Sequence, residues 1–162
     1  MTQSEINQQQ GIGRAGAHEA GTVARPRQLG RSAGAVAAGF AAVVVLSLVT
    51  DQIFHVLDVY PPWGEPMPEP AHNLLALMYR SIYTVGGMYL TARLAPHSPM
   101  RHALIGGVIG TIIAAAGAVA TIPMQLGPAW YPTLLAVTAL PLAWLGGWIY
   151  VRRAHAGPDL KM

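Results

Sequence analysis

Residues 51–70 read DQIFHVLDVYPPWGEPMPEP and separate two long apolar runs. Prolines occupy positions 61, 62, 66, 68 and 70 of this stretch. Proline lacks the backbone N–H and clashes with the preceding helical turn, so a helix cannot continue from the first run into the second. The stretch therefore predicts two helices joined by a proline-rich loop.

The composition indicates a membrane protein. Of the 162 residues, 52% are hydrophobic and only 10% are charged, and the mean hydropathy is +0.37. Soluble domains carry about 25% charged residues, so this chain has too few to cover a surface that faces water. The absence of cysteine excludes a disulfide framework, a cysteine zinc site and a cysteine nucleophile.

Four apolar runs predict four helices, at about 33–57, 71–94, 100–122 and 130–151. Helices of this length cross a hydrocarbon core of roughly 30 Å at about 1.5 Å per residue. We expect an all-α fold, an up-down-up-down bundle of four transmembrane helices within residues 32–153. Residues 1–31 are predicted to be a disordered cytoplasmic tail, and residues 154–162 a short cytoplasmic tail. The first run is too long for the core of a typical signal peptide and is expected to be retained.

Lys and Arg fall on alternate sides of the predicted helices. The basic residues that flank the runs are Arg14, Arg25, Arg27, Arg31, Arg93, Arg101, Arg152, Arg153 and Lys161. The first and third connections contain none. Because basic flanks stay on the cytoplasmic side, both termini should be cytoplasmic. The charges sit where membrane topology needs them, so we expect the lipid bilayer and no nucleic acid as a partner.

Small residues are concentrated in the cytoplasmic halves of the predicted helices, and bulkier polar and aromatic residues in the outer halves. Small residues let helices approach closely, so the bundle should be tight on the cytoplasmic side and have a shallow cavity open to the outside. The stripe Gly106, Gly110 and Ala114 is expected to pack within the chain. The alternative is a seam for a homo-oligomer or a membrane protein partner.

A series of short motifs runs along most of the chain. It comprises Thr50-Asp51, His55, Pro61-Pro62-Trp63-Gly64, Pro66-Met67, Tyr79-Arg80, Gly86-Gly87, Ala92-Arg93-Leu94-Ala95-Pro96, Pro99-Met100-Arg101-His102-Ala103, Gly127-Pro128, Trp130-Tyr131-Pro132 and Ala143-Trp144-Leu145-Gly146-Gly147. In these motifs the chain resembles a family of small bacterial four-helix integral membrane proteins, over roughly residues 35–148. The resemblance implies a bacterial inner (plasma) membrane protein. It brings no activity, substrate or catalytic residue.

Asp51 and Arg80 are the candidate polar site. Asp51 lies about 9 Å below the outer end of the first helix, and Arg80 about 12 Å below the start of the second, at about 1.5 Å per residue. Opposite charges at similar depth on consecutive antiparallel helices are expected to pair. The pair is either a structural link between the helices or, with His55, part of an outward-facing site for a small ligand or ion.

The sequence gives little support for catalysis or metal binding. His55, Asp58, Glu69 and His72 are weak candidates for metal ligands. No catalytic motif is present, and we expect no cofactor. The favoured interpretation is a non-enzymatic structural or accessory membrane subunit. The alternative is a small transporter or ligand-binding membrane protein with a polar site around Asp51, His55 and Arg80.

Overall fold

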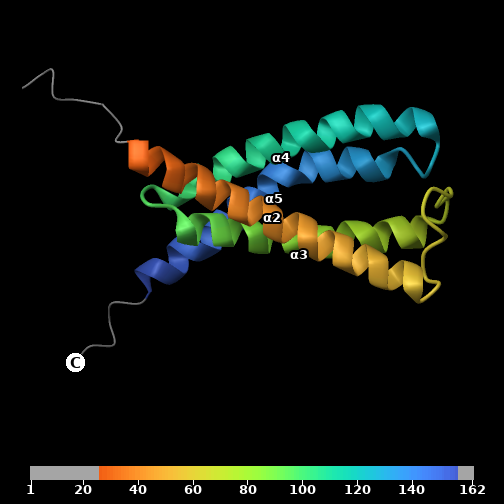
Figure 1. The fold of residues 1–162 in the computed structure, drawn as a ribbon, viewed down its shortest axis with the longest axis horizontal. Coiled ribbons are helices and arrows are strands. Elements are labelled where there is room, and N and C mark those ends of the chain that lie inside the picture. The colour runs from red at the N-terminus through yellow and green to blue at the C-terminus, as the bar shows by residue number, and fades with distance from the viewer. Residues whose placement is uncertain (1–25, 157–162) are drawn as a thin grey trace, which may run out of the picture.

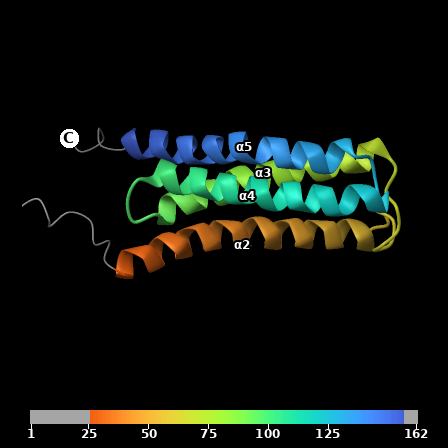
Figure 2. The same cartoon turned by 90° about the horizontal axis from the view of Figure 1, so that it is seen from above.

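The computed structural model describes residues 26–156, with side chains from residue 29 on. Within this range the chain forms four α-helices and one short 3-10 helix. They are α2 (Pro26–Val56), α3 (Pro70–Leu94), α4 (Pro99–Thr121), η1 (Ile122–Met124) and α5 (Trp130–His155). Each α-helix runs antiparallel to the next (Figures 1 and 2). We call the end with the α2–α3 and α4–α5 connections the loop end, and the opposite end the terminal end.

The predicted helices are confirmed, and two of them are longer than expected. α2 begins at Pro26, so the prediction of a disordered tail is wrong for residues 26–31; residues 1–25 lie outside the described range. Proline suits the first helical position, and the Arg, Gln and Leu residues that follow favour a helix. α5 continues to His155, with Arg152 and Arg153 favourably placed at its C-terminus. The predicted C-terminal tail, residues 154–162, therefore starts too early, because α5 includes residues 154 and 155. Residues 157–162 are outside the described range.

Three helical segments within residues 26–156 are long and apolar enough to cross a membrane. They are Leu29–Val56, Pro99–Met124 and Trp130–His155. Their exposed side chains are largely aliphatic, as at Val45, Ile112 and Val137, which suits lipid better than water. α3 spans 25 residues but does not meet the same criterion, because polar residues interrupt its sequence.

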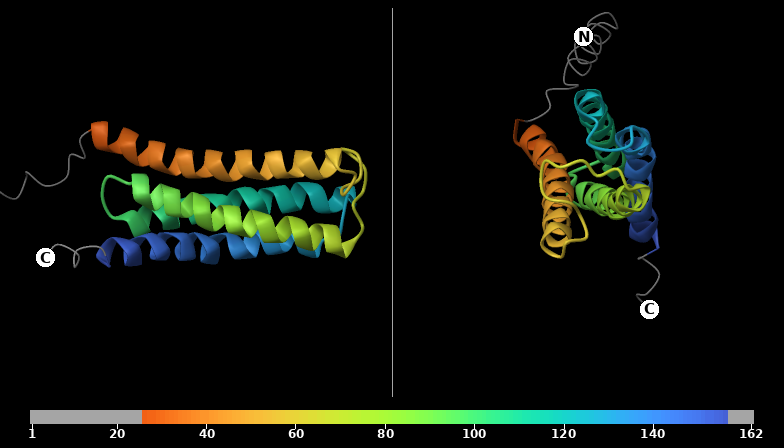
Figure 3. Two further views of the ribbon diagram at one scale, coloured as in Figure 1. Left: turned by 90° about the horizontal axis from the view of Figure 1, so that it is seen from below. Right: turned by 90° about the vertical axis from the view of Figure 1, so that its right-hand side faces the viewer.

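The bundle is open on one side. α3 packs against both α2 and α5, and α5 packs against α4, whereas α2 and α4 make few contacts. The end-on view shows α3 between α2 and α5 (Figure 3). The α2–α3 pair and the α4–α5 pair also separate toward the loop end (Figure 1).

Glycines make the close contacts near the terminal end. A Cβ atom on Gly39 would lie 2.5 Å from the carbonyl oxygen of Gly87, and one on Gly107 would lie 2.6 Å from the Cβ of Ala143. Tight packing of this half is therefore confirmed. Not every glycine takes part, because Gly34 and Gly86 have no such neighbour within 4 Å.

Candidate functional site

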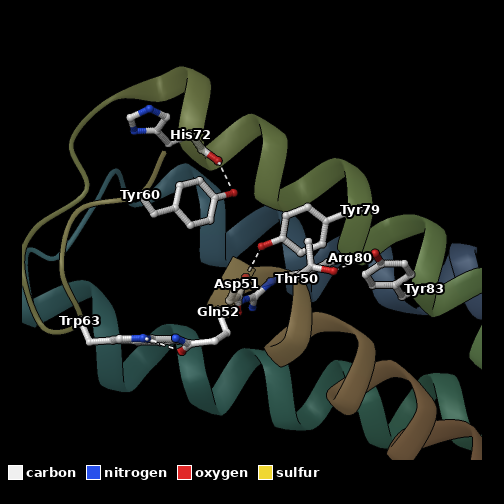
Figure 4. Close-up of polar contacts among 9 residues, drawn as sticks. All are labelled: Thr50, Asp51, Gln52, Tyr60, Trp63, His72, Tyr79, Arg80 and Tyr83. Carbon is white, nitrogen blue, oxygen red and sulfur yellow. Dashed lines mark hydrogen bonds and ion pairs between the residues drawn. The ribbon is translucent and has the colours of Figure 1, made fainter. Parts of the chain in front are cut away.

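Asp51 and Arg80 form a direct ion pair between α2 and α3. The Nη2 atom of Arg80 donates to Oδ2 of Asp51 at 2.6 Å (Figure 4). Asp51 is buried, whereas 32% of the Arg80 side chain is exposed. The prediction from matched depth is therefore correct, and the pair joins two helices near the loop end.

Tyr79 is the second partner of the carboxylate. Its hydroxyl donates to Oδ1 of Asp51, so both carboxylate oxygens accept a hydrogen bond (Figure 4). A buried charge is tolerated only when it is paired and its remaining lone pairs are satisfied. Nearby, Thr50 and Tyr83 share a hydrogen bond of 2.9 Å between their hydroxyls. Polar contacts thus join α2 to α3 at Thr50 and Asp51, two consecutive residues of α2.

Arg80 keeps unused hydrogen-bond capacity. A guanidinium group has five N–H donors. Its hydrogen bond in the described part of the chain is the one to Asp51, and its buried Nε has no partner among the described residues. The pairing is therefore not bidentate, and donors remain for a further acceptor.

A cavity of about 270 Å³ lies at the loop end, next to the ion pair. Asp51, His55 and Arg80 all contribute to its wall, so the structure brings the three predicted residues together. Its other walls come from residues 60–67 of the α2–α3 connection, from Asn73 and Ala76, and from residues 121–132. The volume is close to the lower end of known ligand pockets, about 300–1,000 Å³. We call it the loop-end cavity.

The connection over this cavity is held by specific hydrogen bonds. The side-chain amide of Asn73 donates to the carbonyls of Met67 and Glu69, at 2.8 and 2.9 Å. The backbone N–H of Met67 donates to the carbonyl of Leu126 at 2.6 Å, which ties the two loop-end connections together. The cavity wall is therefore anchored to α3 and to the α4–α5 connection.

Tyr60 gives this connection a second anchor. Its hydroxyl donates to the carbonyl of His72 at 3.3 Å (Figure 4). Burial raises the pKa of Tyr60 above its ordinary value of 10.0, which keeps the hydroxyl protonated and able to donate.

His55 lies in an aromatic setting on the cavity wall. Its ring centroid is 4.1 Å from that of Trp63 and 5.7 Å from that of Tyr60. The indole N–H of Trp63 donates to Gln52 at 3.2 Å, which fixes the indole against α2 (Figure 4). The buried Nδ1 of His55 has no partner among the described residues, so it too is free for a ligand.

The weak metal candidates do not come together. Within the part of the chain that the structure describes, no three His, Asp or Glu side chains are placed to hold a metal ion. His55 instead contacts Trp63, and His72 lies against the ring of Tyr60. His55, Asp58, Glu69 and His72 therefore do not form a set of metal ligands in the described part of the chain.

A second cavity, of about 520 Å³, runs between α2 and α4. We call it the lateral groove. Its lining is mainly small and aliphatic. It shares a set of residues with the loop-end cavity, namely Asp51, Arg80, Thr121, Tyr131 and Pro132. The ion pair therefore lies where the two cavities meet. Sequence reasoning missed Thr121 and Tyr131. Tyr131 belongs to the motif series, but the series does not reveal which way its side chain faces.

The small-residue stripe faces the inside of the chain. A Cβ atom on Gly106 would lie 2.7 Å from the sulfur of Met88, and one on Gly110 would lie 3.5 Å from the ring of Phe40. Gly106, Gly110 and Ala114 also line the lateral groove. Packing within the chain is confirmed for Gly106, while a partner at this stripe stays a prediction.

No family model matches the chain, and neither a curated protein nor a solved structure matches it.

Proposed function

We propose that all four α-helices cross a bacterial inner membrane. α3 joins the same two ends of the bundle as the other helices (Figure 2). Its polar residues Asn73 and Thr91 are fully enclosed, while the exposed positions Leu74, Met78 and Ile82 follow one another at four-residue spacing. Polar residues of membrane helices face the bundle interior, so an apolar outer face supports α3 as a span despite its composition.

The charges support an orientation with both termini in the cytoplasm. The terminal end carries exposed Arg31, Arg93, Arg101, Arg152 and Arg153. The loop end carries the acidic residues Asp58, Glu65 and Glu69. Basic residues favour the cytoplasmic side, so the loop-end cavity would open to the periplasm.

We further propose that the protein is a non-enzymatic ligand-binding membrane protein or small transporter. Its ligand carries an anionic oxygen group that binds Arg80. The observation that carries this proposal is the cavity beside an incompletely paired arginine. A charge within a membrane helix is costly. Arg80 lines the cavity and keeps unused donors, which a link that only joins two helices would not require.

The structural or accessory subunit remains the second candidate. It stays a prediction, supported by small size and the wide apolar surface of α2, where Val44, Val45 and Leu48 are exposed. A stoichiometric membrane partner that co-purifies with the chain and covers this surface would favour it.

Binding can be measured in detergent through melting temperature and tryptophan fluorescence, because Trp63 lies on the cavity wall. The probes are glycerol 1-phosphate, acetate and dioleoylphosphatidylglycerol. At least one should raise the melting temperature and change the emission, and Arg80→Gln should abolish both responses. Trp63→Phe tests whether Trp63, among the four tryptophans of the chain, reports the binding, because the change in emission should then disappear. If none of the probes produces an Arg80-dependent response, the ligand-binding function is wrong.

A further inference from the structure

We propose that the ligand is an amphiphile. Its phosphate or carboxylate head binds Arg80 in the loop-end cavity, and its hydrocarbon chain lies in the lateral groove between α2 and α4. This inference depends on the proposed function and names the class of ligand.

The two cavities are arranged for a molecule of this kind. They meet at Asp51, Arg80, Thr121, Tyr131 and Pro132, so a head at Arg80 can continue directly into the groove. On α4 the groove wall extends from Thr121 back to Gly106. At about 1.5 Å per residue this is on the order of 20 Å, a length suited to a lipid chain and far greater than a small anion needs.

A glycine of α4 leaves space in the lateral groove. Gly117 lines the groove, and a Cβ atom there would have no neighbour within 4 Å. A helical glycine without close packing lowers helix stability and gains no contact in return. A larger side chain at this position would enter the groove, so the glycine leaves room for an occupant.

The charges at the loop end favour an anionic head group that enters from the bilayer rather than from water. Arg80 is the only Lys or Arg within residues 51–80 and 121–135, so it is the cation available at this end. The connections at the loop end carry Asp58, Glu65 and Glu69, and Glu65 lines the cavity itself. These carboxylates repel a free anion that approaches from water. An anionic lipid reaches Arg80 between α2 and α4, where exposed Val44, Leu48 and Ile113 offer an apolar entrance.

The test compares a variant that fills the groove with a matched control. Gly117→Leu places a side chain in the lateral groove. Gly86→Leu is the control, because Gly86 also has no neighbour within 4 Å but lines neither cavity. The probes are dioleoylphosphatidylglycerol, dioleoylglycerol, which lacks the phosphate, and glycerol 1-phosphate, which lacks the chains. Binding is titrated by thermal shift and by native mass spectrometry in detergent.

Dioleoylphosphatidylglycerol should bind wild type and Gly86→Leu alike, and Gly117→Leu should weaken its binding by about ten-fold or more. Arg80→Gln should remove the preference for dioleoylphosphatidylglycerol over dioleoylglycerol. A different result would overturn the amphiphile but not the polar site. In that result, wild type and Gly117→Leu bind glycerol 1-phosphate equally well, and the hydrocarbon chains of dioleoylphosphatidylglycerol add no affinity.

Two further outcomes also overturn the inference. Lipid binding that ignores both the phosphate and Arg80 would indicate unselective lipid around the bundle. A dimer that Gly117→Leu disrupts would make a second copy of the chain the occupant of the groove. If no probe binds through Arg80, the proposed function fails together with this inference.

Discussion

Gly39 of α2 and Gly87 of α3 lie so close together that a methyl group on either would press against the backbone carbonyl of the other. A Cβ atom on Gly39 would be 2.5 Å from the Gly87 oxygen, and one on Gly87 would be 2.7 Å from the Gly39 oxygen. Thr91, fully buried, contacts the same point. The contact fixes the crossing of α2 and α3 near the terminal end, beyond which the helix pairs separate toward the cavities.

Gly87→Ala should therefore destabilise the bundle, because backbone atoms cannot move aside as a flexible side chain can. Overpacking of this kind costs about 1–3 kcal/mol. The neighbouring substitution Gly86→Ala is the matched control, since a Cβ there meets nothing within 4 Å. It should be neutral or slightly stabilising. Melting temperature in detergent separates the two, and equal effects of both substitutions would contradict the close contact.

The helices and the ion pair were predictable from sequence for a physical reason. Long apolar runs interrupted by prolines determine where membrane helices begin and end, and helix rise converts position into depth. Asp51 and Arg80 could be matched by depth alone. The start of α2 at Pro26 was not predictable from hydropathy, because its first turns are polar and only their helix propensity indicates a helix.

The topology gives a second prediction, which also tests α3 as a span. The chain has no cysteine, so single cysteines can be introduced without removing any. Glu65→Cys should react with a membrane-impermeant maleimide added to spheroplasts. His97→Cys, in the turn after α3, should react only after the membrane is broken. Both positions are exposed, so a difference in labelling reports the side of the membrane.

The matched control for this labelling is Ala156→Cys, which lies beyond α5 and should behave like His97→Cys. Equal labelling of Glu65→Cys and His97→Cys in intact spheroplasts would show that α3 does not cross. The opposite pattern would reverse the orientation.

A third prediction concerns the anchor of the cavity wall. Asn73→Ala removes two hydrogen bonds to the carbonyls of Met67 and Glu69. Each lost hydrogen bond costs about 0.5–1.5 kcal/mol, so the melting temperature should fall. Limited proteolysis should also cut faster within residues 61–69. Leu74→Ala, at an exposed neighbouring position, is the control and should change neither measurement.

The composition of the site was only partly accessible to sequence reasoning. Asp51 and His55 are four residues apart on one helix, so their shared face was predictable. Tyr79 was not assigned to the carboxylate, because the rotation of α3 about its own axis could not be deduced from its sequence. Tyr60 depends on the path of a proline-rich loop, which follows from contacts that form only in the folded chain.

The fourth prediction tests the ion pair by a double-mutant cycle. Arg80→Ala leaves a buried carboxylate without its cation, and Asp51→Ala leaves the guanidinium without its anion. Each single change should lower stability. The double change should cost less than the sum, by about 0.5–3 kcal/mol, as for residues in direct contact. Unfolding free energies in detergent provide the measurement, and additive losses would mean that the pair contributes no coupling.

Tyr79 makes this cycle sharper, because its hydroxyl donates to the other oxygen of Asp51. Tyr79→Phe should cost about 1.5–3 kcal/mol in the wild-type chain, the range for a hydrogen bond to a charged group. In the Asp51→Ala background the same change should cost little or nothing, since the hydroxyl has already lost its acceptor. Tyr83→Phe is the matched control: its hydroxyl bonds to Thr50, so its cost should be the same with or without Asp51. Coupling of Asp51 to Tyr79 but not to Tyr83 would locate the stabilising interaction at the carboxylate. Equal coupling to both tyrosines would instead mean that removal of Asp51 loosens the whole α2–α3 contact, and that the ion pair acts through helix packing rather than through its own hydrogen bonds.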